Sequence, residues 1–535
     1  MERSTPEGWG RRFGPLPLLL PVFAAVLLVL PFRGYLTDDT FIYLQYARNL
    51  AAGSGFSFNP GEPSYGFTSP LWTVLLALGL RAGLDPVVAA KALGFLFLTA
   101  TMPVFWLASG WFIGSRRLRL AALLVWSANA WMLRWALSGL ETPMAVFLAL
   151  AAVHLWIAAR RRDRDPWGAS VLLGLAALAR PECLGLLGVA VVDVLLFDAG
   201  KRLRRLGVLA VGAGVLLVPW ALYAQAVFGH FLPNTVFAKG GAFELTPAGL
   251  ARTVRRVVTI VGATTAVETA LAVAGVVAAL RTAARRRAVP EWLRLGFLPA
   301  AWTVALLGLY TVRSAALVSR YLLPAICWLV IFGFAAVSAW LRRWEEERTW
   351  DGSRLEGVRI RHAFGDRTRR LLPPVVTALI LVQNLVVLYR VNLPGATGFT
   401  RGLQGSLVEI GLWLRENTPA EATVAIPDIG AVGYFGERRI IDVSGLITPE
   451  MLPLNRAYEV SDFTARLAFA PVARPDILID RSEEAGRLAQ PGAWPEVCEP
   501  IFSREIGDLG IARPGRYVYT VYRMRWENYR PDDAR

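Results

Sequence analysis

The feature that most constrains this chain is a series of long apolar runs separated by short loops that carry arginine. A helix needs roughly 20 apolar residues to cross the hydrocarbon core of a bilayer. Runs of that length lie near 16–36, 87–113, 119–138, 142–159, 205–228, 257–280, 295–312, 319–341 and 371–390. Two shorter runs, 168–180 and 184–198, are expected to cross as a pair that meets at Arg180-Pro181-Glu182. We therefore predict a polytopic helical membrane protein with about 11 transmembrane helices.

The composition agrees with a membrane protein that has room for one small soluble domain. The chain has 535 residues, of which 55% are hydrophobic and 18% are charged, and its mean hydropathy is +0.43. These values exclude a soluble globular class. The net charge of +16 is carried almost wholly by arginine in short loops, so it indicates membrane orientation and acidic headgroups rather than nucleic acid.

The placement of arginine predicts which loops are cytoplasmic. If the apolar run 71–84 is a juxtamembrane helix, the arginine clusters all fall on one side, at 116–119, 160–164, 201–205, 281–294 and 342–370. The positive-inside rule makes that side cytoplasmic. The signal-like N-terminus lacks a cleavage site and is expected to start an uncleaved first helix on the same side. Outside would lie 37–72, 138–142, 180–182, 229–256, 313–320 and the chain after 393.

A change in composition after Asn392 predicts two domains. Residues 1–392 are expected to form the transmembrane domain, with a first external loop at 37–72 and a cytoplasmic linker at 342–370 that mixes both charge signs. Residues 393–535 are long enough for one small core. Their patterns predict strands at 422–426, 439–443, 476–480 and 516–523, and helices at 407–416 and from 430. This part is therefore predicted to be a small extracytoplasmic α/β domain.

The polar segment 37–72 stands between long apolar runs and holds the most reactive groups. Asp38 and Asp39 follow directly on the first run. A carboxylate costs roughly 2.5–3.5 kcal/mol at the bilayer centre and less toward the interface. Thr37 is a good N-cap, and two acids suit the first turn of a helix that ends at Gly53. We expect a short amphipathic helix that lies along the membrane surface.

Aromatic residues gather in the second half of this segment, around a tight turn at 59–63. They are Phe56, Phe58, Tyr65, Phe67 and Trp72. Aromatic rings with polar neighbours suit either an interfacial belt or a surface that stacks on sugars. The pattern favours the belt and leaves the sugar surface open.

The segment resembles the first external loop of the GT-C glycosyltransferases, a superfamily that takes sugars from polyprenyl-phosphate carriers outside the cytoplasmic membrane. The likeness is strongest to the bacterial group that contains the mycobacterial terminal arabinofuranosyltransferases. Their pattern is Asp-Asp-x-Phe-Ile, Tyr-Ala-x-Asn-Leu, Gly-x-Gly-Phe, Phe-Asn-Pro-Gly-Glu and Thr-Ser-Pro-Leu-Trp. It is matched at 38–42, 46–50, 53–56, 58–62 and 68–72. Segments 413–419, 428–434 and 441–445 resemble the external domain of the same group.

The resemblance implies an inverting glycosyltransferase whose base is a carboxylate in this loop. Asp38 or Asp39 could accept the proton of the attacking hydroxyl, and the analogy favours Asp38. Placing two carboxylates side by side raises the pKa of one of them, whereas a helix N-terminus favours the ionised form. Simple helix capping at the interface is the alternative.

Further site residues follow from the same resemblance. Glu141 resembles a second acidic residue in the next external loop and could bind acceptor or a divalent cation; it could equally be a helix N-terminal charge before Pro143. Lys239, which follows Pro-Asn-Thr and Ala, and Arg320 with Tyr321, in an Arg-Tyr-x-x-Pro motif, could bind the donor phosphate. The alternatives are a solvated loop charge for Lys239 and snorkelling to headgroups for Arg320.

Other polar residues have simpler structural interpretations. Arg180 and Glu182 are expected to form an ion pair with each other, and His230 is expected to be an interfacial loop residue. Asp428 and Asp442 fall at predicted strand ends, where they could hold an acceptor glycan or serve turns.

The sequence contains no motif typical of a zinc site, a catalytic triad or a nucleotide-binding loop. It has no zinc spacing, no Ser-His-Asp arrangement and no nucleotide-binding glycine loop, since 430–436 reads Gly-Ala-Val-Gly-Tyr-Phe-Gly rather than GxGxxG. The cysteines are scattered and are interpreted as packing residues. A divalent cation (Mg, Mn or Ca) could be needed, and its ligands are unknown.

The leading hypothesis is an integral-membrane glycosyltransferase of the bacterial cytoplasmic (inner) membrane. It would move a sugar from a polyprenyl-phosphate-linked donor to an envelope glycan, lipid or protein acceptor, without nucleic acid as a partner. A polytopic transporter of an envelope lipid or sugar is the main rival, and it would need ionisable residues deep inside several helices. A non-catalytic scaffold for envelope assembly is the third hypothesis, and it would not need the acidic pair.

Overall fold

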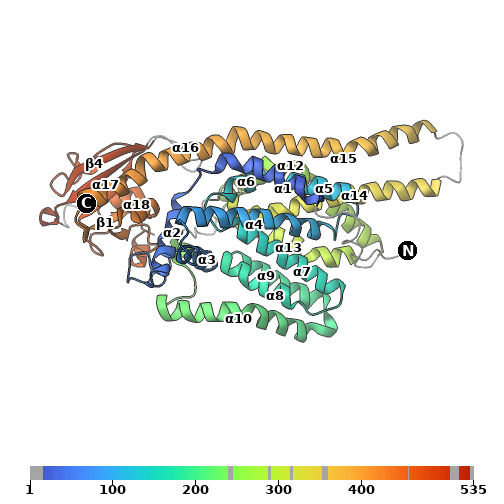
Figure 1. Cartoon of the computed structure of the whole chain (residues 1–535), viewed down its shortest axis with the longest axis horizontal. Coiled ribbons are helices and arrows are strands. Elements are labelled where there is room, and N and C mark those ends of the chain that lie inside the picture. Colours follow the sequence, from blue (N-terminus) through green and yellow to red (C-terminus); the bar gives the residue numbers. More distant parts are fainter. Residues whose placement is uncertain are drawn as a thin grey trace.

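The computed structural model describes residues 16–238, 245–286, 291–313, 317–351, 359–455, 457–458, 460–506 and 517–530. In this described part, a long helical bundle carries a small β-sheet domain at one end (Figure 1). The predicted class of a polytopic helical membrane protein with a C-terminal α/β domain is confirmed. Lys239 and the predicted cytoplasmic start at 1–15 lie outside the described residues.

Seven of the described helices are long and apolar enough to cross a membrane. In Figure 1 they correspond to α4 (Pro86–Ser109), α7 (Thr142–Arg161), α10 (Arg202–Phe228), α12 (Pro247–Arg286), α13 (Glu291–Val312), α14 (Leu323–Asp351) and α15 (Arg359–Val387). The shorter apolar helices are α1 (Leu16–Val29), α3 (Pro70–Arg81), α8 (Trp167–Ala179) and α9 (Cys183–Phe197). These helices account for all the predicted runs except 119–138.

The run 119–138 is broken into two helices, so the prediction of one span there was wrong. Helix α5 (Arg116–Ser127) ends just before Ala128, and α6 (Ala130–Ala136) begins after Asn129. The Asn129 side chain accepts a hydrogen bond from the Met132 N–H at 3.1 Å, which makes it the N-cap of α6. The polar residues of this run, among them Ser127, Asn129 and Arg134, are too scattered in the sequence to reveal such a break.

The loops predicted to be external gather at the end of the bundle that carries the C-terminal domain. Asp39 of the first loop contacts Arg320, and Glu141 contacts Arg180 of the short-helix corner. These contacts join four loops that lie far apart in the sequence. The grouping agrees with the predicted sorting of loops, and the side of the membrane that this end faces stays a prediction.

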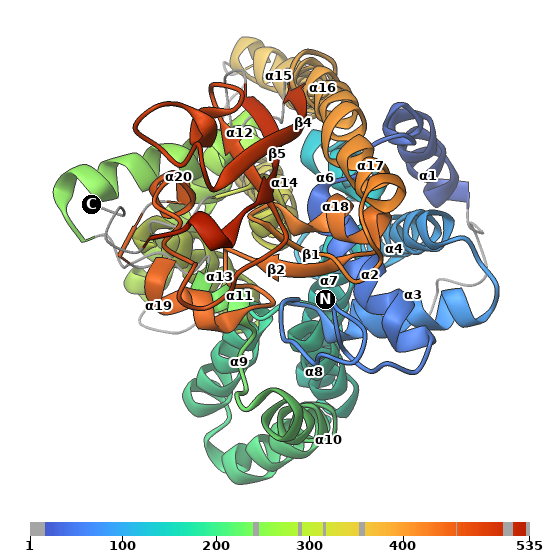
Figure 2. The ribbon, with the colours of Figure 1, turned by 90° about the vertical axis from the view of Figure 1, so that its left-hand side faces the viewer.

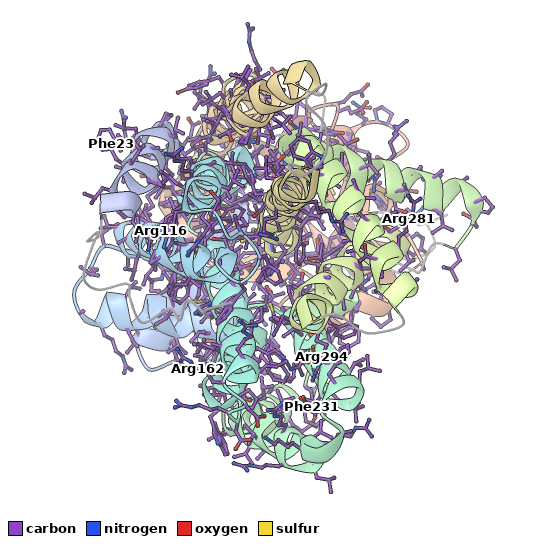
Figure 3. The ribbon with its side chains drawn as sticks, turned by 90° about the vertical axis from the view of Figure 1, so that its right-hand side faces the viewer. Phe23, Arg116, Arg162, Phe231, Arg281 and Arg294 are labelled. Atoms are coloured by element: carbon purple, nitrogen blue, oxygen red, sulfur yellow. The ribbon has the colours of Figure 1, made fainter. Side chains whose placement is uncertain are left out.

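The arginine-rich loops gather at the opposite end. Arg294 donates to the Phe197 carbonyl at 3.0 Å, and Arg343 donates to Thr282 at 3.2 Å. Figure 3 views the molecule from this end and labels Arg116, Arg162, Arg281 and Arg294. Helices α14 and α15 extend past the other helices here (Figure 1), so the predicted linker 342–370 is helical at 342–351 and 359–370.

The C-terminal domain is built on a five-stranded sheet with the order β2-β1-β3-β5-β4. Its strands are β1 (Thr423–Ile426), β2 (Arg439–Asp442), β3 (Ile477–Ser482), β4 (Cys498–Ile506) and β5 (Tyr517–Met524). β1 pairs in parallel with β2 and β3, whereas β5 pairs antiparallel with β3 and β4. Strand β4 was not predicted, because an edge strand with charged residues and Pro500 at an irregular register lacks the usual pattern.

One continuous helix joins the bundle to this domain. After α15 the chain continues through a π-helical turn (Leu388–Asn392), α16 (Leu393–Leu403), a second π-helical turn (Gln404–Val408) and α17 (Glu409–Asn417). Pro394 lacks an N–H and would clash with the preceding turn of a regular α-helix, so the wider π-helical turn accommodates it. The predicted domain boundary at 393 therefore lies within a helix.

A buried carboxylate lies in the middle of α12. Glu268 is fully buried and follows Thr265, where the backbone leaves helical geometry at φ −140° and ψ 31°. No other described residue donates a hydrogen bond to its carboxylate oxygens. Gly333 of α14 packs so closely that a Cβ there would lie 2.8 Å from the Glu268 Cα. An unpaired charge at the bilayer centre costs roughly 2.5–3.5 kcal/mol.

Glu268→Gln is therefore expected to unfold at the temperature of the parent or a few degrees above it. The amide keeps the shape of the side chain and removes the charge. Thermal unfolding in detergent measures the effect, with Glu416→Gln on the exposed face of α17 as the control. A Tm lowered by more than about 3 °C, which corresponds to roughly 1 kcal/mol in a large domain, would contradict the absence of a favourable partner for this carboxylate.

Candidate functional site

The helix that carries the acidic pair begins where the sequence predicts. Thr37 precedes α2 (Asp38–Ala51), and its backbone N–H donates to the Thr40 hydroxyl at 3.2 Å. The Thr40 hydroxyl in turn donates to the Ser138 carbonyl at 2.7 Å. The start of α2 is thereby fixed to the turn that precedes Glu141.

Helix α2 is largely enclosed by protein, and its predicted location along the membrane surface stays a prediction. Figure 2 shows α2 beside α18 (Ile429–Gly436) of the C-terminal domain, and it also packs on α3. Most of its side chains, including the run 40–47, are buried. The amphipathic pattern of the helix reflects polar contacts with the C-terminal domain, which local spacing cannot distinguish from contacts with water.

The aromatic residues of the first loop are also buried, so they form neither an interfacial belt nor an open surface for sugars. They are Phe56, Phe58, Tyr65, Phe67 and Trp72. They pack against one another and against α10, where the Trp220 ring lies 5.3 Å from that of Phe56 and its Nε1 donates to the Tyr65 hydroxyl at 2.9 Å. The predicted belt was wrong because neighbouring elements enclose these rings.

Asp38 is held by the C-terminal domain. Its carboxylate accepts hydrogen bonds from the backbone N–H groups of Gly430 (3.1 Å) and Ala431 (2.8 Å), in the first turn of α18. Asp428 is the N-cap residue of that helix, yet its side chain makes no capping bond. Asp428 accepts instead from Arg481 at 2.6 Å and from the Tyr519 hydroxyl at 2.5 Å.

The surroundings of Asp38 favour its protonated form. Burial is the largest cause, followed by the nearby negative charge of Asp428, and Asp39 contributes in the same direction; together they raise the pKa of Asp38 to about 7. The N–H groups of Ala431 and Gly430 oppose this by stabilising the carboxylate. A carboxyl group with a pKa near neutrality can exchange a proton at physiological pH.

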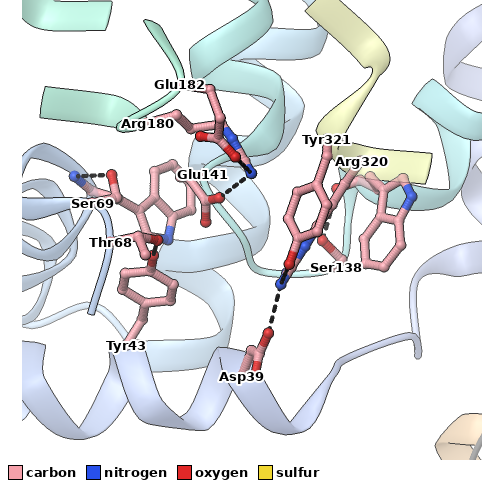
Figure 4. A network of polar contacts seen from close by, with 12 residues as sticks. Asp39, Tyr43, Thr68, Ser69, Ser138, Glu141, Arg180, Glu182, Arg320 and Tyr321 are labelled. Carbon is pink, nitrogen blue, oxygen red and sulfur yellow. Dashed lines mark hydrogen bonds and ion pairs between the residues drawn. The ribbon is translucent and has the colours of Figure 1, made fainter. Parts of the chain in front are cut away.

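Asp39 faces the helical bundle and pairs with an arginine. Its Oδ2 accepts from Nη2 of Arg320 at 2.6 Å, as Figure 4 shows. The Arg320 guanidinium also lies over the rings of Tyr321 (5.2 Å) and Trp135 (5.5 Å). The Arg320 side chain is 11% exposed and that of Asp39 is 32% exposed, so the pair is only partly open to solvent.

A second arginine joins two further acids behind this pair. Arg180 donates to Glu141 at 2.6 Å and to Glu182 at 2.9 Å, and Tyr310 donates to Glu182. The predicted ion pair of Arg180 with Glu182 is confirmed. The bond from Arg180 to Glu141 was not predicted, because it connects loops that are separated by two helices, α7 and α8.

Tyr321 connects the two arginines. Its ring stacks on that of Tyr310 at 5.4 Å with 6° between the planes, and the Arg180 guanidinium lies 4.9 Å from its centre. Figure 4 shows Asp39, Arg320, Tyr321, Arg180 and the two glutamates as one cluster. The structure therefore places the predicted residues Asp39, Glu141, Arg320 and Tyr321 together, whereas sequence reasoning missed Tyr310.

The other predicted candidates lie outside this cluster. His230 stacks on Tyr65 at 5.9 Å, which agrees with a loop residue. Asp442 accepts from the N–H groups of a turn, at Ser444, Leu446 and Ile447. Asp442 thus has the turn role that was the alternative to glycan binding.

The described residues contain no group of three or more His, Cys, Asp or Glu side chains that could hold a metal ion. One oxygen each of Glu141 and Glu182 is buried without a hydrogen-bond partner among the described residues. The involvement of a divalent cation stays a prediction.

Part of the sequence is similar to proteins of known activity. A family described as a domain of unknown function (DUF8728) matches residues 398–522. A terminal β-(1→2)-arabinofuranosyltransferase of Mycobacterium tuberculosis is 30% identical over 236 residues, which cover 41% of this chain and 37% of that protein. A protein of the same description from Corynebacterium glutamicum is 28% identical, with 43% of this chain and 38% of that protein covered. The match thus spans less than two fifths of the length of either relative.

The fold is similar to those of two solved membrane proteins. ArnT from Cupriavidus metallidurans bound to undecaprenyl phosphate aligns with a TM-score of 0.54 at 16% identity, over 95% of this chain and 98% of that one. The Archaeoglobus fulgidus oligosaccharyltransferase in its apo form gives a TM-score of 0.58 at 12% identity, over 88% of this chain and 70% of that one. The predicted GT-C fold, and the resemblance to terminal arabinofuranosyltransferases, are confirmed.

Proposed function

We propose that this chain is an inverting glycosyltransferase that moves a sugar from a polyprenyl-phosphate donor to an envelope glycan, lipid or protein. The observation that carries the proposal is the pairing of Asp39 with Arg320 directly beside Asp38, at the end of the bundle where the predicted external loops meet. A basic oxygen and an anion-binding guanidinium are the two groups that this transfer needs. The names of the similar proteins support the donor class, and an arabinofuranosyl donor is the first to test.

In the proposed reaction, Asp38 is the base. The acceptor hydroxyl gives its proton to the Asp38 carboxylate as its oxygen attacks the anomeric carbon from the face opposite the phosphate. The new glycosidic bond forms while the bond between the anomeric carbon and the phosphate oxygen breaks, so the configuration inverts. Each Asp38 oxygen accepts a single N–H from α18, which leaves a lone pair on each for the acceptor.

Arg320 is proposed to bind the departing phosphate. Its guanidinium is mostly buried and is neutralised by Asp39 in the absence of donor. A donor phosphate would replace or share this partner, and charge-assisted bonds from arginine to phosphate are among the strongest in proteins. Arg180 is already bonded to both glutamates. We therefore propose that Arg180 positions the Tyr321 ring and does not contact the phosphate directly. Lys239 stays a proposed further contact.

The rate of transfer is expected to rise with pH through a midpoint near 7. Below that pH Asp38 holds a proton and cannot accept another, because its pKa is raised to about 7. Removing the negative charge of Asp428 favours the ionised form of Asp38, so Asp428→Asn should move the midpoint of kcat/KM to lower pH. The amide oxygen that this substitution introduces can still accept from Arg481 and Tyr519.

The measurement is the pH dependence of kcat/KM for the parent and for Asp428→Asn. Asp476→Asn is the matched control, because Asp476 also accepts hydrogen bonds in this domain but does so from Thr423, at the far ends of β1 and β3. An unchanged or higher midpoint in Asp428→Asn would argue against Asp38 as the titrating base.

The proposed function is tested by incubating the purified chain with polyprenyl-phosphate sugars that carry labelled arabinose or labelled hexoses, together with envelope acceptors. The expected result is label joined covalently to an acceptor, with free polyprenyl phosphate released. Movement of labelled lipid across proteoliposomes without bond formation would favour the transporter. Neither transfer nor movement with any donor would favour the scaffold.

A further inference from the structure

The C-terminal domain contacts the acidic pair through two backbone hydrogen bonds to Asp38, a contact that the sequence alone does not reveal. We propose that this domain is a positioning part of the site, in which the first turn of α18 holds Asp38 and thereby sets Asp39 toward Arg320. The inference rests on the proposed function. It assigns a role to the domain whose residues 398–522 match the family described as a domain of unknown function. Three independent observations carry it.

The first observation is a substituted helix cap. The N–H groups in the first turn of a helix have no acceptor within that helix, and an N-cap aspartate normally supplies one. Asp428 occupies the N-cap position but turns to Arg481 and Tyr519. Asp38 takes its place with bonds of 3.1 and 2.8 Å. A loop residue more than three hundred positions earlier in the chain therefore completes α18.

The second observation is a glycine face on α18. A Cβ at Gly430 would lie 2.1 Å from the Asp38 carbonyl oxygen and 2.8 Å from its carboxyl carbon. A Cβ at Gly433, one helical turn further, would lie 2.6 Å from the Phe58 ring. Side chains at these two positions would push the first loop away. The glycines of the Gly-Ala-Val-Gly pattern therefore allow the first loop to pack closely on α18. This packing accounts for the glycines without a dinucleotide-binding loop.

The third observation is that the first loop also covers the edge of the sheet. The Asn59 side chain accepts from the Ile440 N–H and donates to the Ile440 carbonyl, both at 2.9 Å. These bonds satisfy the backbone of edge strand β2 as a neighbouring strand would. The exposed contact of Arg48 with Glu437 at 3.4 Å adds little. Docking therefore depends on backbone hydrogen bonds and close packing.

The geometry has a direct consequence for the acidic pair. Asp38 and Asp39 are adjacent on one helix, so their side chains point in directions about 100° apart. Holding Asp38 against α18 leaves Asp39 facing Arg320. The groups that face Asp38 are Asp39 on its own helix, Asp428 and the first turn of α18, so a shift of the domain changes both its orientation and its charge environment.

Gly430→Ala tests the inference in the full-length protein. It should lower kcat/KM by about 100-fold, the loss expected when a reacting group is misplaced by about 1 Å. It should also shift the pH midpoint from the parent value toward the ordinary range of a carboxyl group, because Asp428 and the surrounding atoms move away from Asp38. Gly405→Ala is the matched control, since a Cβ there meets open space. Equal activity and an equal midpoint in Gly430→Ala would overturn the inference.

Amide hydrogen exchange tests the same contact without reference to activity. In the parent, the amides of Gly430 and Ala431 should exchange slowly, and Asp38→Ala should make them exchange at least tenfold faster. Asp476→Ala should leave them unchanged. If the parent transfers no sugar but shows this exchange pattern, the proposed function fails and the docking contact stands. If Asp38→Ala leaves both amides slow, the docking contact fails whatever the activity.

Discussion

Asp38→Asn is expected to lower kcat/KM for sugar transfer by about 10³-fold, within the 10² to 10⁴ range that general-base catalysis contributes. The amide has nearly the same size as the carboxyl group, so the docking of α18 loses at most one of its two hydrogen bonds to this side chain. What the variant loses is the capacity to accept a proton from the acceptor hydroxyl. The measurement is steady-state transfer from a labelled polyprenyl-phosphate donor.

Two comparisons separate this role from structural damage. Asp476→Asn changes an aspartate of the C-terminal domain that bonds Thr423 on an exposed face, and it should retain parent activity. Asp39→Asn should cost less than Asp38→Asn, because it removes the partner of Arg320 rather than the base. The reverse order, with Asp39→Asn inactive and Asp38→Asn nearly normal, would assign the base to Asp39.

Arg320→Gln is expected to lower kcat/KM by about 10² to 10³-fold, as the loss of one preorganised group that stabilises charge in a transition state typically does. When the phosphate departs, its negative charge lies beside the Arg320 guanidinium. The Arg320 side chain is only 11% exposed, so water cannot take the place of the guanidinium in stabilising that charge. Arg320→Lys should recover part of the activity, because it restores the charge without the planar pair of donors.

A double variant distinguishes phosphate binding from simple neutralisation of Asp39. If Arg320 served only to balance that carboxylate, Asp39→Asn combined with Arg320→Gln would recover the activity lost in Arg320→Gln. Under the proposed role the double variant stays at least as impaired as Arg320→Gln. Arg439→Gln is the control for losing an arginine ion pair, since Arg439 and Glu62 are about half exposed, and it should leave transfer unchanged.

The sequence was informative where signals are local or linear. Apart from the run 119–138, the long apolar runs correspond to helices of the structure, and Thr37 with two acids marks the start of α2. The tail strands that follow hydrophobic patterns were found for the same reason. The order of motifs in the first loop was sufficient to indicate the GT-C fold, because that pattern is long.

The sequence was uninformative where two distant segments meet. The aromatic residues of the first loop were assigned to an interface because their burial depends on α10, which local composition does not show. The bond between Arg180 and Glu141 depends on how α7 and α8 pack, and the hold of α18 on Asp38 depends on the whole tail domain. The glycine spacing of 430–436 was the available signal for the last contact, and it became interpretable once its neighbour was known.

The most direct test of the central claim is a structure of the purified chain in a lipid nanodisc with bound undecaprenyl phosphate. The account predicts that the phosphate lies about 3 Å from the Arg320 guanidinium, between α2 and Tyr321, with Asp38 still held by Gly430 and Ala431. A phosphate bound at the opposite end of the bundle, among Arg116 and Arg294, would contradict it.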